Sequence, residues 1–166
     1  MLHINLVCLG KLKESYWREA ETEYLKRLGA FAKIKIIELK EESFDEKDNP
    51  DKVKAKDAAK ILKSIPENSF VVVLDSKGKN FSSEQLSQQL LGYQPASVAY
   101  YATSARQSNI TFIIGGPLGL HESILPIAQL KLSLSSLTFT HQMARVILWE
   151  QPYRAFMIGA GRNYHY

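Results

Sequence analysis

The hydrophobic pattern of the chain switches repeatedly between short apolar runs and longer stretches with helical spacing. Runs of β-branched and aromatic residues predict strands over residues 3–9, 33–39, 69–74, 110–114 and 130–134. Apolar residues three and four apart predict helices over residues 14–28, 58–65, 82–91 and 122–128, and a last helix after Thr140. Strands alternating with helices are typical of an α/β domain with a mostly parallel sheet flanked by helices. Ligands of such sheets bind at the carboxyl ends of strands, which draws attention to the turns after Leu74, Ile114 and Leu134.

Local signals mark the ends of the expected helices. Gly29 fits a helix C-cap, and Ser82 begins a sequence with the spacing of a capping box. Thr140 can cap the last helix, whose residues 143–149 are apolar almost all round. Such a helix is packed on several sides or lies at a subunit interface. Pro152 falls inside the same helix and is expected to kink or interrupt it.

At 166 residues and 45% hydrophobic content, the chain is long enough for one full core and too short for two comfortable domains. We therefore expect one domain over residues 1–166. No apolar run approaches the roughly 20 residues of a membrane span, and the amino terminus lacks a cleavable signal pattern, so a cytoplasmic protein is expected. Cys8 is the only cysteine, which excludes an internal disulfide, and its apolar neighbours favour a buried structural thiol over a nucleophile.

The net charge of +4 is concentrated toward the carboxyl terminus. From Tyr101 onward, five lysines and arginines stand against two glutamates, which gives +3 of the total. Four of these five cations are arginines, which suit bidentate contact with phosphate and stacking on bases. A nucleic-acid partner is compatible with this distribution, although a few solvated surface arginines explain it equally well. One of them, Arg145, lies four residues after His141 on the last helix, where a structural role is equally open.

The turn GGPLG, directly after the fourth predicted strand, is the most suggestive candidate for a ligand site. Its adjacent glycines, Gly115 and Gly116, would let the backbone approach a flat or anionic ligand and expose N–H groups to it. The turn lacks the Gly-Lys-Ser/Thr of a phosphate loop and the spacing of a dinucleotide fingerprint. A tight strand-to-helix turn without any ligand is an equal alternative.

A second candidate follows the last predicted strand, where hydroxyl groups alternate with apolar side chains. This mix is expected of a pocket for a small, partly apolar ligand, although an ordinary strand end before a helix cap would look similar. The residues are Leu134, Ser135, Ser136, Leu137, Thr138 and Phe139. No metal site is predicted, because the four histidines have no cysteine partners and no H-E-x-x-H spacing.

The carboxyl-terminal segment combines cations, aromatic rings and an imidazole. Arg154, with Tyr153 and Phe156, and the tail around Tyr164 and His165 offer charge stabilisation, phosphate contact and base stacking. These are the side chains with which proteins bind unpaired RNA. A tail without a partner is the simpler alternative, because chain ends are usually poorly ordered.

Three motifs in order, GGPLGL, LSLSSLTFTHQMARVILWEQPYRAF and a terminal NYHY, closely resemble the SPOUT-class family of ribosomal RNA large-subunit methyltransferase H. The similarity includes the opening LVCLGKLKESYWREAETEYLKRL and the VVLDSKGK turn, so it covers the whole chain. It implies a trefoil-knotted α/β fold, a homodimer built on the carboxyl-terminal helices, and methylation of N3 of a pseudouridine in 23S rRNA with S-adenosyl-L-methionine as cofactor. The family usually has proline where Thr140 stands and an aliphatic residue where Pro152 stands.

The resemblance also implies roles for individual residues. Arg154, Tyr164 and His165 match positions on the RNA-facing side of the site. Arg154 would stabilise charge on the uracil oxygens, and His165 would accept the N3 proton if any side chain does. The cofactor-binding positions that it implies are Leu74, Gly115, Gly116, Leu134, Ser135, Ser136, Leu137, Thr138 and Phe139.

Two other functions stay open at this point. The first is a non-catalytic, ribosome-associated RNA-binding protein, which would bind RNA without binding the cofactor. The second is a nucleotide-binding oxidoreductase, although the late position and the spacing of the glycine turn argue against it.

Overall fold

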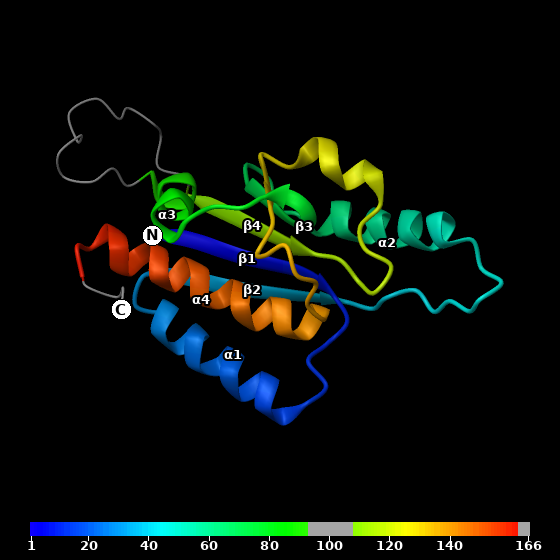
Figure 1. Cartoon of the computed structure of the whole chain (residues 1–166), viewed down its shortest axis with the longest axis horizontal. Helices are drawn as coiled ribbons and strands as arrows, with labels where there is room; N and C mark the ends of the chain where they lie inside the picture. The colour runs from blue at the N-terminus through cyan, green and yellow to red at the C-terminus, as the bar shows by residue number, and fades with distance from the viewer. Residues whose placement is uncertain (93–107, 163–166) are drawn as a thin grey trace.

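The computed structural model describes residues 1–92 and 108–162, in which strands and helices alternate along the chain (Figure 1). The strands are β1 (Leu2–Leu9), β2 (Ala32–Leu39), β3 (Phe70–Lys79), β4 (Asn109–Ile114) and β5 (Leu130–Leu132). The helices are α1 (Ser15–Leu28), α2 (Pro50–Ser64), α3 (Ser83–Leu91) and α4 (His141–Gly159), with a short 3₁₀ helix, η1 (Glu122–Ile127). Each strand and helix predicted from the hydrophobic pattern is therefore present.

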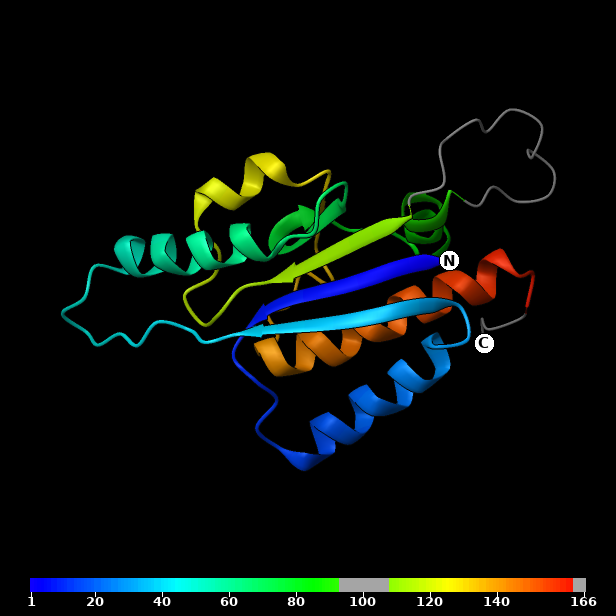
Figure 2. The same cartoon turned by 180° about the vertical axis from the view of Figure 1, so that it is seen from behind.

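The strands form one sheet in the order β2-β1-β4-β3-β5, and each neighbouring pair is parallel. This confirms the predicted α/β class with a parallel sheet. Because the strands run in the same direction, their carboxyl ends meet at one edge of the sheet, and their amino ends at the other (Figure 2).

Helices cover both faces of the sheet, and alternate residues of β1 show how the core is divided. Leu6 belongs to a buried cluster with residues of α1, α3 and α4, such as Leu28 and Trp149. Val7 belongs to a second cluster with residues of α2 and η1, such as Ile61. Figures 1 and 2 show α1 and α4 on one face and α2 with η1 on the other. None of the helices in the described part of the chain has the length and hydropathy needed to cross a membrane.

Local signals in the sequence fix several helix ends as predicted. Ser82 and Gln85 form a complete capping box at the start of α3, and the Thr140 hydroxyl accepts a hydrogen bond from the backbone N–H of Met143 at the start of α4. The N–H of Gly29 closes α1 on the carbonyl of Leu25. These caps satisfy backbone groups that a helix end leaves unpaired.

Pro152 does not interrupt the last helix, so that part of the expectation was wrong. α4 runs without a break from His141 to Gly159, and Pro152 is buried within it. A proline removes one helical N–H donor. Here α4 packs against both α1 and α3, and this packing holds the helix together across the missing hydrogen bond. The trefoil knot implied by the family resemblance stays a prediction.

Candidate functional site

Three loops implied as cofactor-binding meet at the carboxyl edge of the sheet. Strands β4, β3 and β5 are adjacent in that order. Gly115 and Gly116 directly follow β4, and residues 134–139 follow β5. Leu74 of β3 lies opposite Leu132 of β5, and Leu132 is two residues before the start of the 134–139 loop. The fold thus brings together positions that are far apart in the sequence, at the edge where parallel sheets bind ligands.

The glycine turn after β4 is held by a backbone hydrogen bond between two of its own residues. The N–H of Gly119 donates to the carbonyl of Gly116 at 2.9 Å, and Gly119 has a φ of +78°, which favours glycine. A Cβ atom at Gly115 would lie 2.9 Å from Cγ of Leu120. The positive φ accounts for glycine at position 119, and packing within the turn accounts for glycine at position 115. At Gly116 the nearest atom to a Cβ would be Cδ1 of Leu9, at 3.4 Å, which places the end of β1 directly beside the turn.

β3 continues beyond its predicted end through an irregular segment. Leu74 and Lys79 both lie opposite Leu132, so the intervening residues bulge out of the ladder. The N–H of Ser133 donates to the carbonyl of Lys79 at 3.0 Å, which fastens the far side of the bulge to β5. A Cβ atom at Gly78 would lie 2.7 Å from the carbonyl oxygen of Lys131, so the two backbones touch there. The bulge is therefore fixed at the root of the 134–139 loop.

Local hydrogen bonds shape the 134–139 loop. The Ser133 hydroxyl donates to the carbonyl of Ser135 at 2.9 Å, and the Ser135 hydroxyl accepts from the N–H of Leu137 at 3.0 Å. Leu137 is 71% exposed, although it is a large apolar residue. An exposed leucine on a hydrogen-bonded loop, with hydroxyl groups beside it, fits a ligand that is partly apolar and partly polar.

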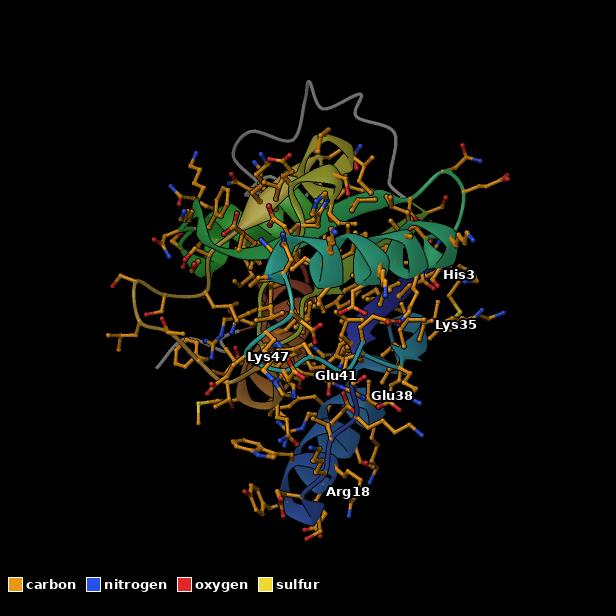
Figure 3. The ribbon with its side chains drawn as sticks, turned by 90° about the vertical axis from the view of Figure 1, so that its right-hand side faces the viewer. His3, Arg18, Lys35, Glu38, Glu41 and Lys47 are labelled. Carbon is orange, nitrogen blue, oxygen red and sulfur yellow. The ribbon has the colours of Figure 1, made fainter. Side chains whose placement is uncertain are left out.

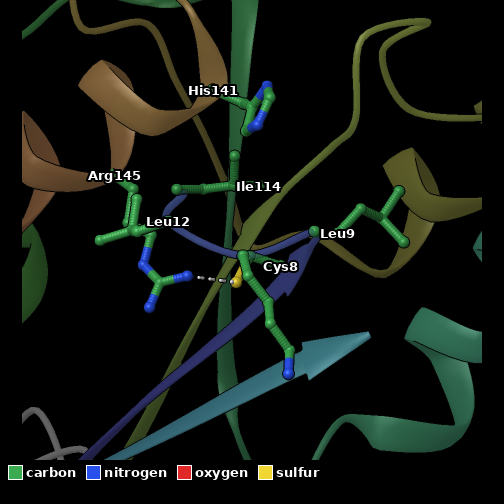
Figure 4. A pocket seen from close by; sticks show the side chains of 8 residues that line it. Cys8, Leu9, Leu12, Ile114, His141 and Arg145 are labelled. Atoms are coloured by element: carbon green, nitrogen blue, oxygen red, sulfur yellow. Dashed lines mark hydrogen bonds between the residues drawn. The ribbon is translucent and has the colours of Figure 1, made fainter. Parts of the chain in front are cut away.

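A small cavity lies beside these loops, at the carboxyl ends of β1 and β4 (Figure 4). Its volume is about 10 Å³, room for about one water molecule and too small for a cofactor or a nucleobase. Eight residues line it: Cys8, Leu9, Gly10, Lys11, Leu12, Ile114, His141 and Arg145. Figure 3 looks at the molecule from this side, with Glu38 and Glu41 at the end of β2 and Arg18 on α1.

One of the residues that line this cavity, Arg145 of α4, is the centre of a buried ion-pair network. Its Nε and Nη2 donate to the two carboxylate oxygens of Glu21 on α1, at 2.6 and 2.7 Å. Its Nη1 donates to Glu38 of β2 at 2.8 Å. The indole Nε1 of Trp149 donates to Glu21 at 2.7 Å. The network joins α1, β2 and α4.

The network and its burial raise the pKa values of Arg145 and of the neighbouring Cys8 thiol. Burial is the largest single influence on Arg145 and opposes its charge, but the hydrogen bonds to Glu21 and Glu38 and the nearby negative charges together outweigh it and raise the pKa of the guanidinium. Burial also raises the pKa of the Cys8 thiol, to about 11, against the opposing charge of Arg145. Cys8 is 2% exposed, and its sulfur lies 3.4 Å from Nη1 of Arg145. The prediction of a buried thiol is confirmed, and Arg145 has a structural role.

Sequence reasoning missed Glu21, Glu38 and Trp149. Glu21 lies on a helix rich in charged residues, where nothing marks it as buried. The available signal was Arg145, a charged residue inside an almost entirely apolar helix, since such a residue needs a buried partner of opposite charge.

No group of three histidine, cysteine, aspartate or glutamate side chains is placed to hold a metal ion within residues 1–92 and 108–162.

A family model described as "Predicted SPOUT methyltransferase" matches residues 2–165. The chain belongs to the SPOUT methyltransferase family. It is 44% identical to a protein of Clostridium acetobutylicum and 43% identical to one of Pelotomaculum thermopropionicum, each named "Ribosomal RNA large subunit methyltransferase H". A protein of Halothermothrix orenii with the same name is 42% identical. These alignments cover 99%, 100% and 99% of this chain, and the same shares of the three relatives.

Membership in a methyltransferase family implies a methyl donor as cofactor. It also decides against the nucleotide-binding oxidoreductase considered above. The comparisons cover the chain from end to end, so they include both the loops at the carboxyl edge and the carboxyl-terminal segment.

Of the residues expected on the RNA side, Arg154 lies far from the 134–139 loop within one chain. Arg154 donates to Glu150, from Nε at 2.8 Å and also from Nη2. Its neighbour Phe156 is 9% exposed and stacks on Phe31, which directly precedes β2 at the amino edge of the sheet. α4 begins at the carboxyl edge and runs back across the sheet, so Arg154 is about 20 Å along the helix from His141.

Two details of the sequence-based interpretation change as a result. Phe156 belongs to the core and stacks on Phe31, so it presents no free face for a base. Tyr153 makes an edge contact with Phe31, and the Arg27 guanidinium lies over its ring. Tyr164 and His165 lie outside the described residues.

Proposed function

We propose that this chain transfers a methyl group from S-adenosyl-L-methionine to N3 of a pseudouridine in 23S rRNA. The observation that carries the proposal is the end-to-end identity of 42–44% with proteins named ribosomal RNA large subunit methyltransferase H. The convergence of the three loops at the carboxyl edge supports it independently, because it supplies a site of suitable chemistry. An enzyme with this substrate would work in the cytoplasm, on ribosomes or their precursors.

The cofactor-binding residues we propose are those carried over by motif: Leu74, Gly115, Gly116, Leu134, Ser135, Ser136, Leu137, Thr138 and Phe139. Their described environment fits the cofactor. Backbone groups and serine hydroxyls suit its polar amino-acid and ribose parts, and the exposed Leu137 suits the flat adenine. When bound, the cofactor supplies an electrophilic methyl group.

The remaining work of the protein is to orient the target base and to deal with its N3 proton. Methyl transfer is an in-line displacement, so holding the base nitrogen in contact with the methyl group and excluding water contribute most. We assign Arg154 to charge stabilisation on the uracil oxygens, Tyr164 to contact with the base, and His165 to acceptance of the N3 proton. Kinetics of Arg154→Ala and His165→Ala at saturating cofactor test this. Wild-type turnover in both variants would contradict it.

We further propose that the working site is built by two chains of a homodimer. Arg154 lies on the part of α4 that packs at the amino edge of the sheet, whereas the proposed cofactor loops lie at the carboxyl edge, so a single chain keeps Arg154 away from these loops. A second copy packed on α4 with the opposite direction would bring its own carboxyl-terminal segment to these loops. The apolar residues Met143, Val146 and Ile147 of α4 are only half-buried and suit such a contact.

A complementation experiment tests the two-chain site. A variant with a damaged cofactor turn, Gly115→Val, and the variant Arg154→Ala are each expected to be inactive. Unfolded and refolded together, or co-expressed, they should form mixed dimers in which one site carries both defects and the other none. Activity should then recover to roughly a quarter of the wild-type value, because half of the dimers are mixed. No recovery despite mixed dimers would place the whole site within one chain.

Calorimetry and an rRNA methylation assay test the proposed function as a whole. Titration with S-adenosyl-L-methionine should show binding, and labelled methyl groups should appear in 23S rRNA when the protein and cofactor are added to ribosomes from cells that lack it. Mass mapping of that rRNA then identifies the modified nucleotide. RNA binding without cofactor binding would favour the non-catalytic alternative and overturn the proposal.

A further inference from the structure

The loop between β1 and α1 exposes two lysines and a tyrosine whose role is not explained by the fold. Lys11 and Lys13 are exposed, and Tyr16 is 59% exposed, which is unusual for so large an aromatic residue. Within residues 1–92 and 108–162, neither lysine has an ion-pair partner. We call Lys11, Lys13 and Tyr16 the β1–α1 surface.

Contacts on the inner side of the loop hold these three residues in place. Leu12, between the two lysines, is buried. The Arg18 guanidinium donates to the carbonyls of Leu12 and Lys13, at 3.1 and 2.5 Å. The backbone N–H of Lys13 donates to the side chain of Gln142 at the start of α4, at 2.8 Å. These contacts fix the backbone of the loop, so less backbone freedom is lost when a ligand binds there.

The β1–α1 surface lies beside the candidate cofactor site. The side chain of Leu9 at the end of β1 lies next to the position that a Cβ of Gly116 would take, and Lys11 follows two residues later, within about 7 Å along the backbone. Lys11 also lines the small cavity together with His141 and Ile114. A macromolecule that places a reacting group at the cofactor loops would therefore meet these lysines.

Several other cations of the chain are paired with acids within the protein. On α2, Lys54 pairs with Asp51, and Lys60 pairs with Glu42 and Asp57. Arg145 is buried in its network, and Arg154 pairs with Glu150. The carboxyl-terminal arginines that suggested a nucleic-acid partner from the sequence are thus partly engaged elsewhere. Lys11 and Lys13, which the charge distribution did not single out, keep their charge available, with Glu14 the one acid between them and α1.

We propose that the β1–α1 surface binds the rRNA substrate next to the target nucleotide, with Lys11 and Lys13 on phosphates and Tyr16 stacked on an unpaired base. Basic side chains beside an exposed aromatic ring are the groups with which proteins bind single-stranded RNA. The Trp17 ring packs against Tyr16, with centroids 5.1 Å apart, and holds it outward. The charge of the surface favours RNA over a second copy of this chain, whose own excess is also positive. The inference rests on the proposed function.

Three variants and a matched control test this surface by direct binding to purified ribosomal large-subunit particles. We expect K11A/K13A to weaken binding about tenfold at 0.15 M salt and to lower the slope of log affinity against log salt by about 1.5 to 2. Tyr16→Ala should weaken binding about fivefold or more, whereas Tyr16→Phe should restore it. The control K52A/K63A removes the same charge from exposed positions of α2 on the other face of the sheet and should change neither affinity nor slope.

Calorimetry with S-adenosyl-L-methionine and the mass in solution separate the possible failures. The variants should bind the cofactor as the wild type does and should keep its oligomeric state. Unchanged particle affinity in K11A/K13A and Tyr16→Ala overturns the inference, as does an equal loss in the α2 control. A change of oligomeric state in these variants overturns it in favour of a subunit contact. If the wild type fails to bind the cofactor, the proposed function fails, while particle binding still reports on this surface.

Discussion

Removal of Glu21 should destabilise the protein more than removal of any comparable acid on α1. Its carboxylate accepts three hydrogen bonds, two from Arg145 and one from Trp149, at 2.6 to 2.7 Å. The side chains of Glu21 and Arg145 are only 9% and 6% exposed. In Glu21→Ala, the Arg145 charge would stay buried with Glu38 as its remaining carboxylate partner, and breaking such a buried pair costs about 3–5 kcal/mol. This is a large fraction of the roughly 5–15 kcal/mol that stabilises a typical domain.

Urea denaturation and thermal melting measure the effect. For a chain of this size, a loss of 3–5 kcal/mol should lower the melting temperature by roughly 6–20 °C. The matched control is Glu23→Ala, two residues away on the same helix. Glu23 pairs with Arg27 at 52% and 42% exposure, so its removal should cost no more than about 0.5 kcal/mol. Replacing both partners, in E21M/R145M, should recover part of the loss because no unpaired charge remains. If Glu21→Ala and Glu23→Ala differ by less than about 1 kcal/mol, the network does not stabilise the fold as argued.

Three further predictions concern single positions. Because burial raises the pKa of Cys8 to about 11, the native state keeps a proton that the unfolded chain loses from about pH 9 upward. Stability should therefore fall as pH rises from 9 to 11, by at most about 2–3 kcal/mol, and urea titrations of Cys8→Ala should show a flatter dependence. Gly78→Ala would press a Cβ atom against the Lys131 carbonyl, so it should lower the stability of the fold by about 1–3 kcal/mol and weaken cofactor binding in calorimetry. The control Gly29→Ala, whose Cβ would meet no atom closer than 3.4 Å, should change neither stability nor cofactor binding. Ser82→Ala removes the capping box of α3 and should lower stability by about 1 kcal/mol in thermal melts; an unchanged melting temperature would show that α3 is held by packing alone.

The sequence predicted the order and type of the elements well because each strand and helix carries its own hydrophobic period. It predicted the end of β3 at Leu74, where the apolar run stops, but the backbone rejoins the ladder at Lys79. That return depends on the contact between Gly78 and the Lys131 backbone, two segments more than 50 residues apart, so no local pattern could indicate it. The same holds for Pro152, whose effect is decided by the packing of α4 on α1 and α3.

Prediction of the site was uneven for a physical reason. The loops at Gly115 and at residues 134–139 follow strands directly, so the general rule for parallel sheets is enough to bring them together. The role of charged residues depends on pairing, which the sequence does not show. Arg145 looked like a possible RNA contact and is instead bound to Glu21 and Glu38. Nothing in the sequence distinguishes Lys11 from other lysines, yet it has no carboxylate partner in the described part of the chain and lines a cavity beside the glycine turn.

Helix α4 connects the 134–139 loop to the β1–α1 surface. The helix begins where the 134–139 loop ends, and its first turns are tied to α1 and β2 through Arg145 and to the β1–α1 loop through Gln142. A buried charge network is a poor source of stability compared with apolar packing, but it allows fewer alternative registers of one helix on another. Any shift of α4 along α1 would break the two-pronged contact of Arg145 with Glu21. The network thus fixes the end of the 134–139 loop relative to the β1–α1 surface. If this loop binds the cofactor as we propose, disruption at Glu21 should alter cofactor and RNA binding together, whereas substitutions at Lys11 or Lys13 should alter RNA binding alone.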